Sequence, residues 1–148
     1  MKGFMFDTNI FNHLLDSGIN LDTLPIAQIY FTFEQSDELQ KTKDVDRRKK
    51  LLSVFQLCEP TETTIGTFVL DNARLDKTQI GNGVLFGKIL ERLDSTEKKN
   101  NNYIDALIAE SSHINGLTFV TDDAVLLETC LEMDISTITL SQFLELAK

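Results

Sequence analysis

The stretch KGFMFDTNIF, residues 2–11, determines how we interpret the rest of the chain. Its apolar run Gly3–Phe6 predicts a strand that is buried on both faces of a parallel sheet. Asp7 ends this run, and Thr8 and Asn9 follow as residues that turn the chain and start a helix. Because open α/β sheets bind ligands at the carboxyl ends of their strands, Asp7 is either a helix cap or a ligand-binding carboxylate.

The length and composition indicate one globular domain over residues 1–148. The apolar share of 42% is normal for a folded domain. No run approaches the roughly 18 apolar residues of a membrane span, and the start of the chain lacks a signal-peptide pattern. Cys58 and Cys130 lie far apart and predict reduced core thiols rather than a disulfide. We therefore expect a cytoplasmic protein with no membrane partner.

The net charge of −9 argues against a broad nucleic-acid-binding surface, because attraction to phosphates dominates such binding. Acidic side chains that hold divalent cations would offset part of this charge. Any contact with nucleic acid would then be local and assisted by metal ions. The alternative is that the acidic balance serves only solubility.

The patterns of apolar residues and turn residues predict alternating strands and helices, without repeats or linkers. We expect strands at residues 3–6, 27–33, 117–120 and 135–140, and helices at 9–17, 34–57, 84–93, 103–115, 124–133 and 141–148, the last with Ser141 as its N-cap. Thr32 and Gln35 resemble a capping box at the start of the long helix. Residues 59–83 fit either a hairpin or a loop that crosses the edge of the sheet.

Glu38 is the second acid of interest. On one continuous helix over residues 34–57, helical periodicity places it on the stripe that faces the sheet. A carboxylate there costs several kcal/mol unless it is paired or bound to a cation. Glu34 lies one turn earlier on nearly the same stripe and competes for this role. The alternative for Glu38 is a hydrated position near the helix start, where an acid favours the helix dipole.

The same predicted helix carries a run of basic residues. They are Lys41, Lys43, Arg47, Arg48, Lys49 and Lys50. Such runs are usually solvated helix faces, and the alternative is a surface that binds a partner.

Further acids follow in the second half of the chain. Asp105 lies in the first turn of a helix that is apolar nearly all round, so that helix is packed on more than one side. The strand 117–120 runs directly into Thr121, Asp122 and Asp123, which repeats the arrangement at Asp7.

Acids at strand ends and helix starts of one parallel sheet converge at a single edge. Clustered carboxylates repel one another unless cations lie between them, and ligand sets made only of oxygen select Mg²⁺ or Mn²⁺. His13 and His113 are too few and too scattered for a zinc site. A carboxylate-held dication activates water and suits phosphodiester hydrolysis.

The segments FDTNIF, NNYIDALIAE and LTFVTDD, together with the helix of Glu38, resemble the acidic motifs of the PIN-domain family, which includes the VapC-like toxins. The resemblance spans most of the chain. It implies a three-layer α/β/α fold around a small central parallel sheet of four or five strands. It also implies a Mg²⁺- or Mn²⁺-dependent ribonuclease that cleaves single-stranded or loop RNA.

The resemblance also assigns site residues by position. The first three acids are Asp7, Glu38 and Asp105, and the fourth motif, Thr-x-Asp, selects Asp123 over Asp122. Thr8, Asn9, Thr121 and Asp122 are then supporting residues, and Lys98 or Lys99 is a candidate for contact with phosphate. Solvated loop positions are the alternative for both lysines. The implied partners are an RNA substrate, an antitoxin protein and a second copy of the chain.

Two other hypotheses stay open. A catalytically silent PIN-like binding module would use the basic helix face or an apolar patch to recognise a protein or RNA partner, such as an antitoxin-like peptide. A phosphotransferase with Asp7 as its nucleophile fits less well, because Asn9 stands where such enzymes place a second acid.

Overall fold

The computed structural model describes residues 3–20, 24, 28–58, 60–62, 84–98 and 101–146. The strands are β1 (Gly3–Phe6), β2 (Gln28–Phe31), β3 (Thr61–Glu62), β4 (Thr118–Val120) and β5 (Thr137–Ile138). The helices are α1 (Thr8–Ser17), α2 (Phe33–Gln40), α3 (Val45–Leu57), α4 (Val84–Thr96), α5 (Asn102–Ile114), α6 (Ala124–Glu132) and α7 (Leu140–Glu145).

The strands form one parallel sheet in the order β3-β2-β1-β4-β5. The first strand is therefore central, and Phe6 pairs with Val120 of β4 in the register that joins the two halves of the chain. The apolar run of residues 3–6 forms a strand with buried neighbours on both sides, as its sequence predicts.

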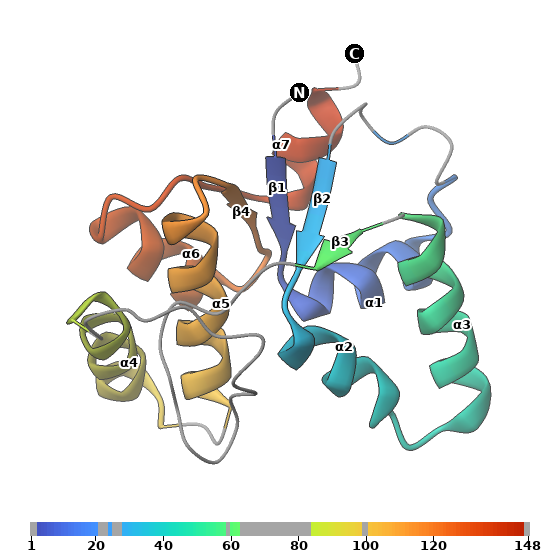
Figure 1. Cartoon of the computed structure of the whole chain (residues 1–148), viewed down its shortest axis with the longest axis horizontal. Coiled ribbons are helices and arrows are strands. Elements are labelled where there is room, and N and C mark those ends of the chain that lie inside the picture. The colour runs from blue at the N-terminus through green and yellow to red at the C-terminus, as the bar shows by residue number, and fades with distance from the viewer. Residues whose placement is uncertain are drawn as a thin grey trace.

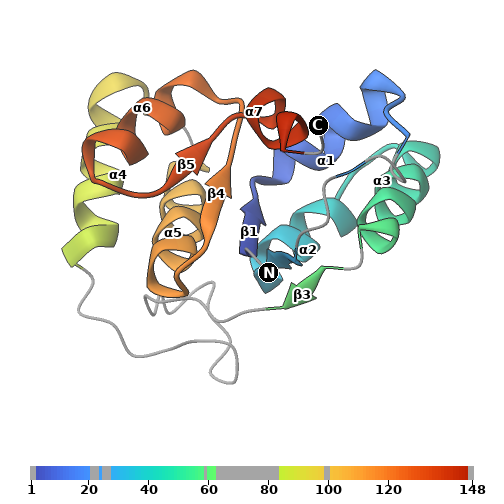
Figure 2. The same ribbon diagram turned by 90° about the horizontal axis from the view of Figure 1, so that it is seen from above.

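Helices cover both faces of the sheet and make three layers (Figures 1 and 2). Phe4 and Phe6 point to one face, where they pack against α1, α3 and α7. Met5 points to the other face and packs against α4, α5 and α6. This alternation is the normal side-chain period of a strand, and it confirms the predicted α/β/α architecture.

The prediction of one long helix over residues 34–57 is wrong. The helix α2 ends at Gln40, and α3 begins at Val45 after a turn. Asp44 is the N-cap of α3, because its Oδ1 accepts a hydrogen bond from the Arg47 N–H at 3.1 Å. In Figure 1 the two helices run in different directions on either side of the turn, so a periodicity counted across the turn does not describe either helix.

Other boundaries also differ from the prediction. The second strand stops at Phe31 because Thr32 is the N-cap of α2. The last strand is confined to Thr137–Ile138, and α7 begins at Leu140 with Thr139, not Ser141, as its N-cap. Residues 63–83 lie outside the described residues, as does the predicted choice there between a hairpin and an edge-crossing loop.

Both cysteines are free, which confirms the prediction of unpaired thiols. Burial raises the pKa of Cys58 to about 11, so the thiol form dominates near neutral pH. None of the helices in the described ranges has the length and apolarity needed to cross a bilayer.

Candidate functional site

Asp7 lies at the carboxyl end of β1 and is only 4% exposed. It occupies the N-cap position of α1, but its carboxylate does not cap that helix. Its Oδ2 instead accepts a hydrogen bond of 2.8 Å from the hydroxyl of Thr121, which follows β4. The Asp7 N–H donates to the carbonyl of Val120 at 2.9 Å, so the pairing of β1 with β4 holds the two residues together.

The surroundings of Asp7 disfavour its charged form. Burial raises the pKa of this carboxyl to about 6, while the hydrogen bond from Thr121 opposes the rise. The charge of Asp123 raises the pKa further, and the Thr8 backbone N–H and His13 lower it. Asp7 makes no ion pair with any residue that the structure describes. Among the described residues, no cation lies at ion-pair distance from this buried acid, which makes its ionised form costly.

Glu38 lies beside Asp7, on α2. Burial raises the pKa of Glu38 to about 7, and the charge of Asp7 raises it further. The Thr8 hydroxyl opposes this rise, while Glu34, which is buried on the same helix, adds to it. The charge of Asp7 therefore adds to the cost of ionising Glu38.

Gln35 accounts for the position of Glu38 at the site, even though the predicted helix over residues 34–57 is two separate helices. Its Oε1 accepts the Thr32 N–H at 2.7 Å, which confirms the predicted pairing of these residues at the helix start. Its Nε2 donates to the carbonyl of Phe6, the last residue of β1. Gln35 is fully buried and ties the start of α2 to the end of β1. The sequence analysis missed this bond, for which a polar side chain in an otherwise buried first turn is the signal.

Asp105 and Asp123 form the other half of the site. Both line a cavity of about 20 Å³, together with Leu93, Glu97, Asn102 and Val125. Such a volume holds about one water-sized species. Asp123 also caps α6, because its Oδ1 accepts the Leu126 N–H at 3.0 Å. The Asp123 N–H donates to the Thr121 hydroxyl oxygen at 3.2 Å, so Thr121 contacts both halves of the site.

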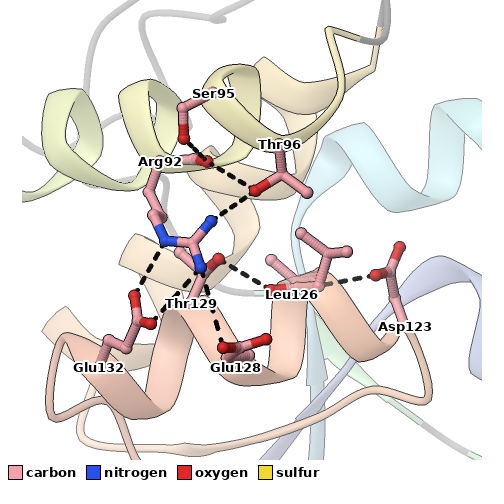
Figure 3. A network of polar contacts seen from close by, with 9 residues as sticks. Arg92, Ser95, Thr96, Asp123, Leu126, Glu128, Thr129 and Glu132 are labelled. Carbon is pink, nitrogen blue, oxygen red and sulfur yellow. Dashed lines mark hydrogen bonds and ion pairs between the residues drawn. The ribbon is translucent and has the colours of Figure 1, made fainter.

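An arginine on α4 links that helix to α6, the helix that Asp123 caps (Figure 3). Arg92 Nε donates to Glu132 of α6 at 3.0 Å, and Glu128 lies 3.9 Å from the same guanidinium group. A further bond from Arg92 goes to the Thr96 hydroxyl, at the end of α4. The network fixes α4 against the helix that Asp123 caps.

Some predicted supporting residues lie apart from this arrangement. Asn9 is exposed. Asp122 accepts the Leu140 N–H at 3.0 Å and contacts His13 Nδ1 at 2.9 Å, so it links the turn after β4 to α7 and α1. Lys98 is exposed beside the cavity-lining residue Glu97, and Lys99 lies outside the described residues.

The four predicted acids form two pairs, Asp7 with Glu38 and Asp105 with Asp123, and Thr121 contacts both pairs. Within the described ranges, no three His, Cys, Asp or Glu side chains lie close enough to hold one ion between them. The donor set nevertheless fits a hard dication, because it contains only oxygen. The buried Thr8 Oγ1 lacks a well-formed hydrogen bond and is a further oxygen at the Asp7–Glu38 pair.

No protein-family model matches the sequence, and no curated protein matches it significantly. Solved structures do share its fold. VapBC2 from Rickettsia felis, solved bound to a DNA fragment from their promoter, is 18% identical, with a TM-score of 0.56 over 93% of this chain and 98% of that one. PAE2754 from Pyrobaculum aerophilum is 14% identical, with a TM-score of 0.58 over 99% of this chain and 95% of that one.

A domain of a functionally unknown protein from Methanocaldococcus jannaschii is also 14% identical, with a TM-score of 0.55 over 95% of this chain and 91% of that one. These identities are low, so the likeness shows the fold alone. Over nearly its whole length, the chain therefore has the fold of VapBC and PIN-domain proteins.

Proposed function

We propose that this protein is a Mg²⁺- or Mn²⁺-dependent ribonuclease that hydrolyses phosphodiester bonds in single-stranded or loop RNA. The observation that carries the proposal is the pair formed by buried Asp7 and half-buried Glu38, because burial raises the pKa of both carboxyls and the charge of Asp7 raises that of Glu38 further. Ionised carboxylates in such surroundings need a bound cation.

Asp7 with Glu38, and Asp105 with Asp123, are the carboxylates that would hold an ion or orient water, two in each pair. When bound, such an ion supplies a Lewis acid that lowers the pKa of coordinated water and makes hydroxide available near neutral pH. Thr121 donates to Asp7 and accepts from the Asp123 backbone, so it would keep both acids oriented toward the ion.

We also propose an antitoxin protein as a partner and the cytoplasm as the location. The support is the fold shared with VapBC2 from Rickettsia felis and the sequence resemblance to VapC-like toxins. Co-purification with the product of an adjacent reading frame, and loss of RNA cleavage in that complex, would be the expected result. A neighbouring product that neither binds the chain nor inhibits it would contradict the toxin role without affecting the nuclease.

The central test is cleavage of a labelled single-stranded RNA by the purified protein. We expect cleavage with Mn²⁺ or Mg²⁺, loss with a chelator and recovery when the ion is added back. Asp7→Asn keeps the size of the side chain but removes its charge, so activity should fall by more than about 100-fold, the upper end of losses from changes outside the ligand shell. Unchanged cleavage by a variant that combines Asp7→Asn with Asp105→Asn would rule out the proposal.

A second candidate is a metal-free binding module with the same fold. The observation that favours it is that no three acidic, histidine or cysteine side chains of the described chain come together as ion ligands. Isothermal titration of the intact protein with Mn²⁺ separates the two functions. Absence of binding would favour the module, and binding that Asp7→Asn abolishes would favour the nuclease.

A further inference from the structure

A buried asparagine lies at the cavity that Asp105 and Asp123 line. Asn102 is the first residue of α5, and Asp105 follows three positions later on the same side of the helix. Asn102 is only 4% exposed. Burying a primary amide is costly unless its polar atoms are bonded, so the partners of this amide decide what it contributes.

Two hydrogen bonds fix the orientation of the amide. Its Nδ2 donates to Asp94 Oδ1 at 2.9 Å and to the Glu97 carbonyl at 2.7 Å. These bonds join the end of α4 and the turn after it to the start of α5, and the two helices pack side by side (Figures 1 and 2). Both partners are acceptors, so a flipped amide would place oxygen against oxygen. The nitrogen therefore faces α4.

The amide oxygen, Oδ1, has no hydrogen-bond partner among the residues that the structure describes. The side-chain oxygens of this part of the chain that are both unbonded and closed off from solvent belong to Thr8 and Thr32. Asn102 Oδ1 is not one of them, so a water-sized species reaches it even though the residue is buried. The space that the side chain lines is the cavity of about 20 Å³, which holds about one such species.

We propose that Asn102 Oδ1 is a third protein ligand for a hard dication, Mg²⁺ or Mn²⁺, that Asp105 and Asp123 bind at this cavity. The inference rests on the proposed metal-dependent function and assigns an ion to one of the two carboxylate pairs. Carboxylates and amide carbonyls are the protein ligands that hard cations use. An amide oxygen adds a ligand without adding negative charge, so it does not increase the repulsion between the two carboxylates.

The test is Mn²⁺ binding by the intact protein, measured by isothermal titration. Asn102→Ala and Asn102→Asp both lose the two bonds that Nδ2 donates, but only Asn102→Asp keeps an oxygen at the cavity. We expect Asn102→Ala to weaken Mn²⁺ binding about 10- to 100-fold, and Asn102→Asp to bind at least as tightly as about one third of the wild-type affinity. Thermal melts in EDTA measure what each variant costs the fold.

The matched control is Asp94→Ala. It removes one of the two bonds that join α4 to α5 but keeps Oδ1 and the bond from Nδ2 to the Glu97 carbonyl. Its Mn²⁺ affinity should therefore stay within about 3-fold of the wild type.

A second measurement uses a ratio of two affinities, which a general loss of stability does not change. Asn102→Cys replaces the hard oxygen with soft sulfur, so its preference for Cd²⁺ over Mn²⁺ should rise at least about 10-fold above that of the wild type. Cys58 and Cys130 are present in both proteins and do not affect the comparison.

Equal losses of Mn²⁺ affinity in Asn102→Ala and Asn102→Asp would overturn the inference, because Asn102 would then only join α4 to α5. An unchanged Cd²⁺ preference in Asn102→Cys would also overturn it. The nuclease would survive either result if the wild type still bound Mn²⁺ and cleaved RNA. Binding of Mn²⁺ through Asn102 without RNA cleavage would reject the nuclease and keep the ligand, and a wild type that binds no Mn²⁺ would overturn both.

Discussion

Two turns of this molecule share a local sequence pattern but use their acids differently. After β1 the chain reads Phe6, Asp7, Thr8, and after β4 it reads Val120, Thr121, Asp122, Asp123. In the second turn each acid has a structural partner: Asp123 caps α6 and Asp122 accepts from Leu140 at the start of α7. In the first turn Asp7 caps nothing, although it occupies the N-cap position.

The difference shows that a strand-end acid without a structural partner is a functional candidate, while a capping acid such as Asp123 needs a second observation, here the cavity that it lines with Asp105. A carboxylate that accepts backbone N–H groups at a helix start is stabilised by the fold and by the helix dipole. Asp7 receives a hydroxyl bond from Thr121, yet burial still raises its pKa to about 6. A buried acid whose negative charge is poorly stabilised by the fold is therefore the better candidate for binding an external cation.

The strongest test of this comparison is to replace Asp122 and Asp123 one at a time. Asn caps helices about as well as Asp, so both Asp122→Asn and Asp123→Asn should fold. For Asp123→Asn we expect a loss of RNA cleavage of more than about 100-fold, because the carboxylate charge beside Asp105 is gone. For Asp122→Asn we expect activity within about 2-fold and a stability loss below about 1 kcal/mol.

Cleavage rates with Mn²⁺ and thermal melts of both variants give the answer. Equal activities of Asp122→Asn and Asp123→Asn would mean that the second turn contains only structural acids. A deep loss in Asp122→Asn alone would reverse the assignment of the two residues.

A second prediction concerns stability against pH in the absence of divalent ions. The folded-state pKa of Asp7, about 6, exceeds its ordinary value of 3.8, so the folded protein binds more protons than the unfolded chain. Stability should therefore be greatest near pH 4 and fall as the pH rises to about 7. The shift of Asp7 alone corresponds to roughly 3 kcal/mol, and Glu38, with a pKa of about 7, extends the fall upward in pH.

Urea unfolding with EDTA at several pH values measures this dependence, and Asp7→Asn should flatten it. Addition of Mn²⁺ at pH 7.5 should raise the stability of the wild type more than that of Asp7→Asn, because the ion binds the folded state. A wild type whose stability is flat over this range would show that Asp7 is not held in costly surroundings.

The smallest effect is expected from the contacts between α4 and α6. Arg92 and its acidic partners are largely exposed, and exposed ion pairs contribute little. Arg92→Gln should lower the Tm by no more than about 3 °C and leave cleavage within about 2-fold. A large loss of activity with normal stability would show that this network, rather than Thr121, sets the position of Asp123.

The sequence predicted the central part of the fold well because its signals are local. The buried run before Asp7, the apolar helix around Asp105 and the strand before Thr121 all appear as expected. The turn between α2 and α3 has neither Gly nor Pro, so only the N-cap Asp44 indicates it. The start of α7 was misplaced for a similar reason, since Thr139 and Gln142 form a capping box there.

The site itself was predictable only in part. Glu38 lies next to Asp7, yet the periodicity that suggested this position counted residues beyond the end of α2. What places Glu38 is the contact between Gln35 and the carbonyl of Phe6, a tertiary bond whose local signal is only a polar side chain in an otherwise buried first turn. The bond from the Leu140 N–H to Asp122 is likewise tertiary, whereas Asp123 directly precedes the helix that it caps, which is a local pattern.

The pairing of β1 with β4 has a consequence for how the chain can be divided. A cut between β3 and α4 gives two polypeptides, one with Asp7, Glu38 and three strands and one with Asp105, Asp123 and two strands. Neither polypeptide carries all of the acids, and the hydrogen bonds between the two central strands are what would bring them together. If the two fragments are co-expressed, nuclease activity would therefore report whether β1 of one fragment has paired with β4 of the other.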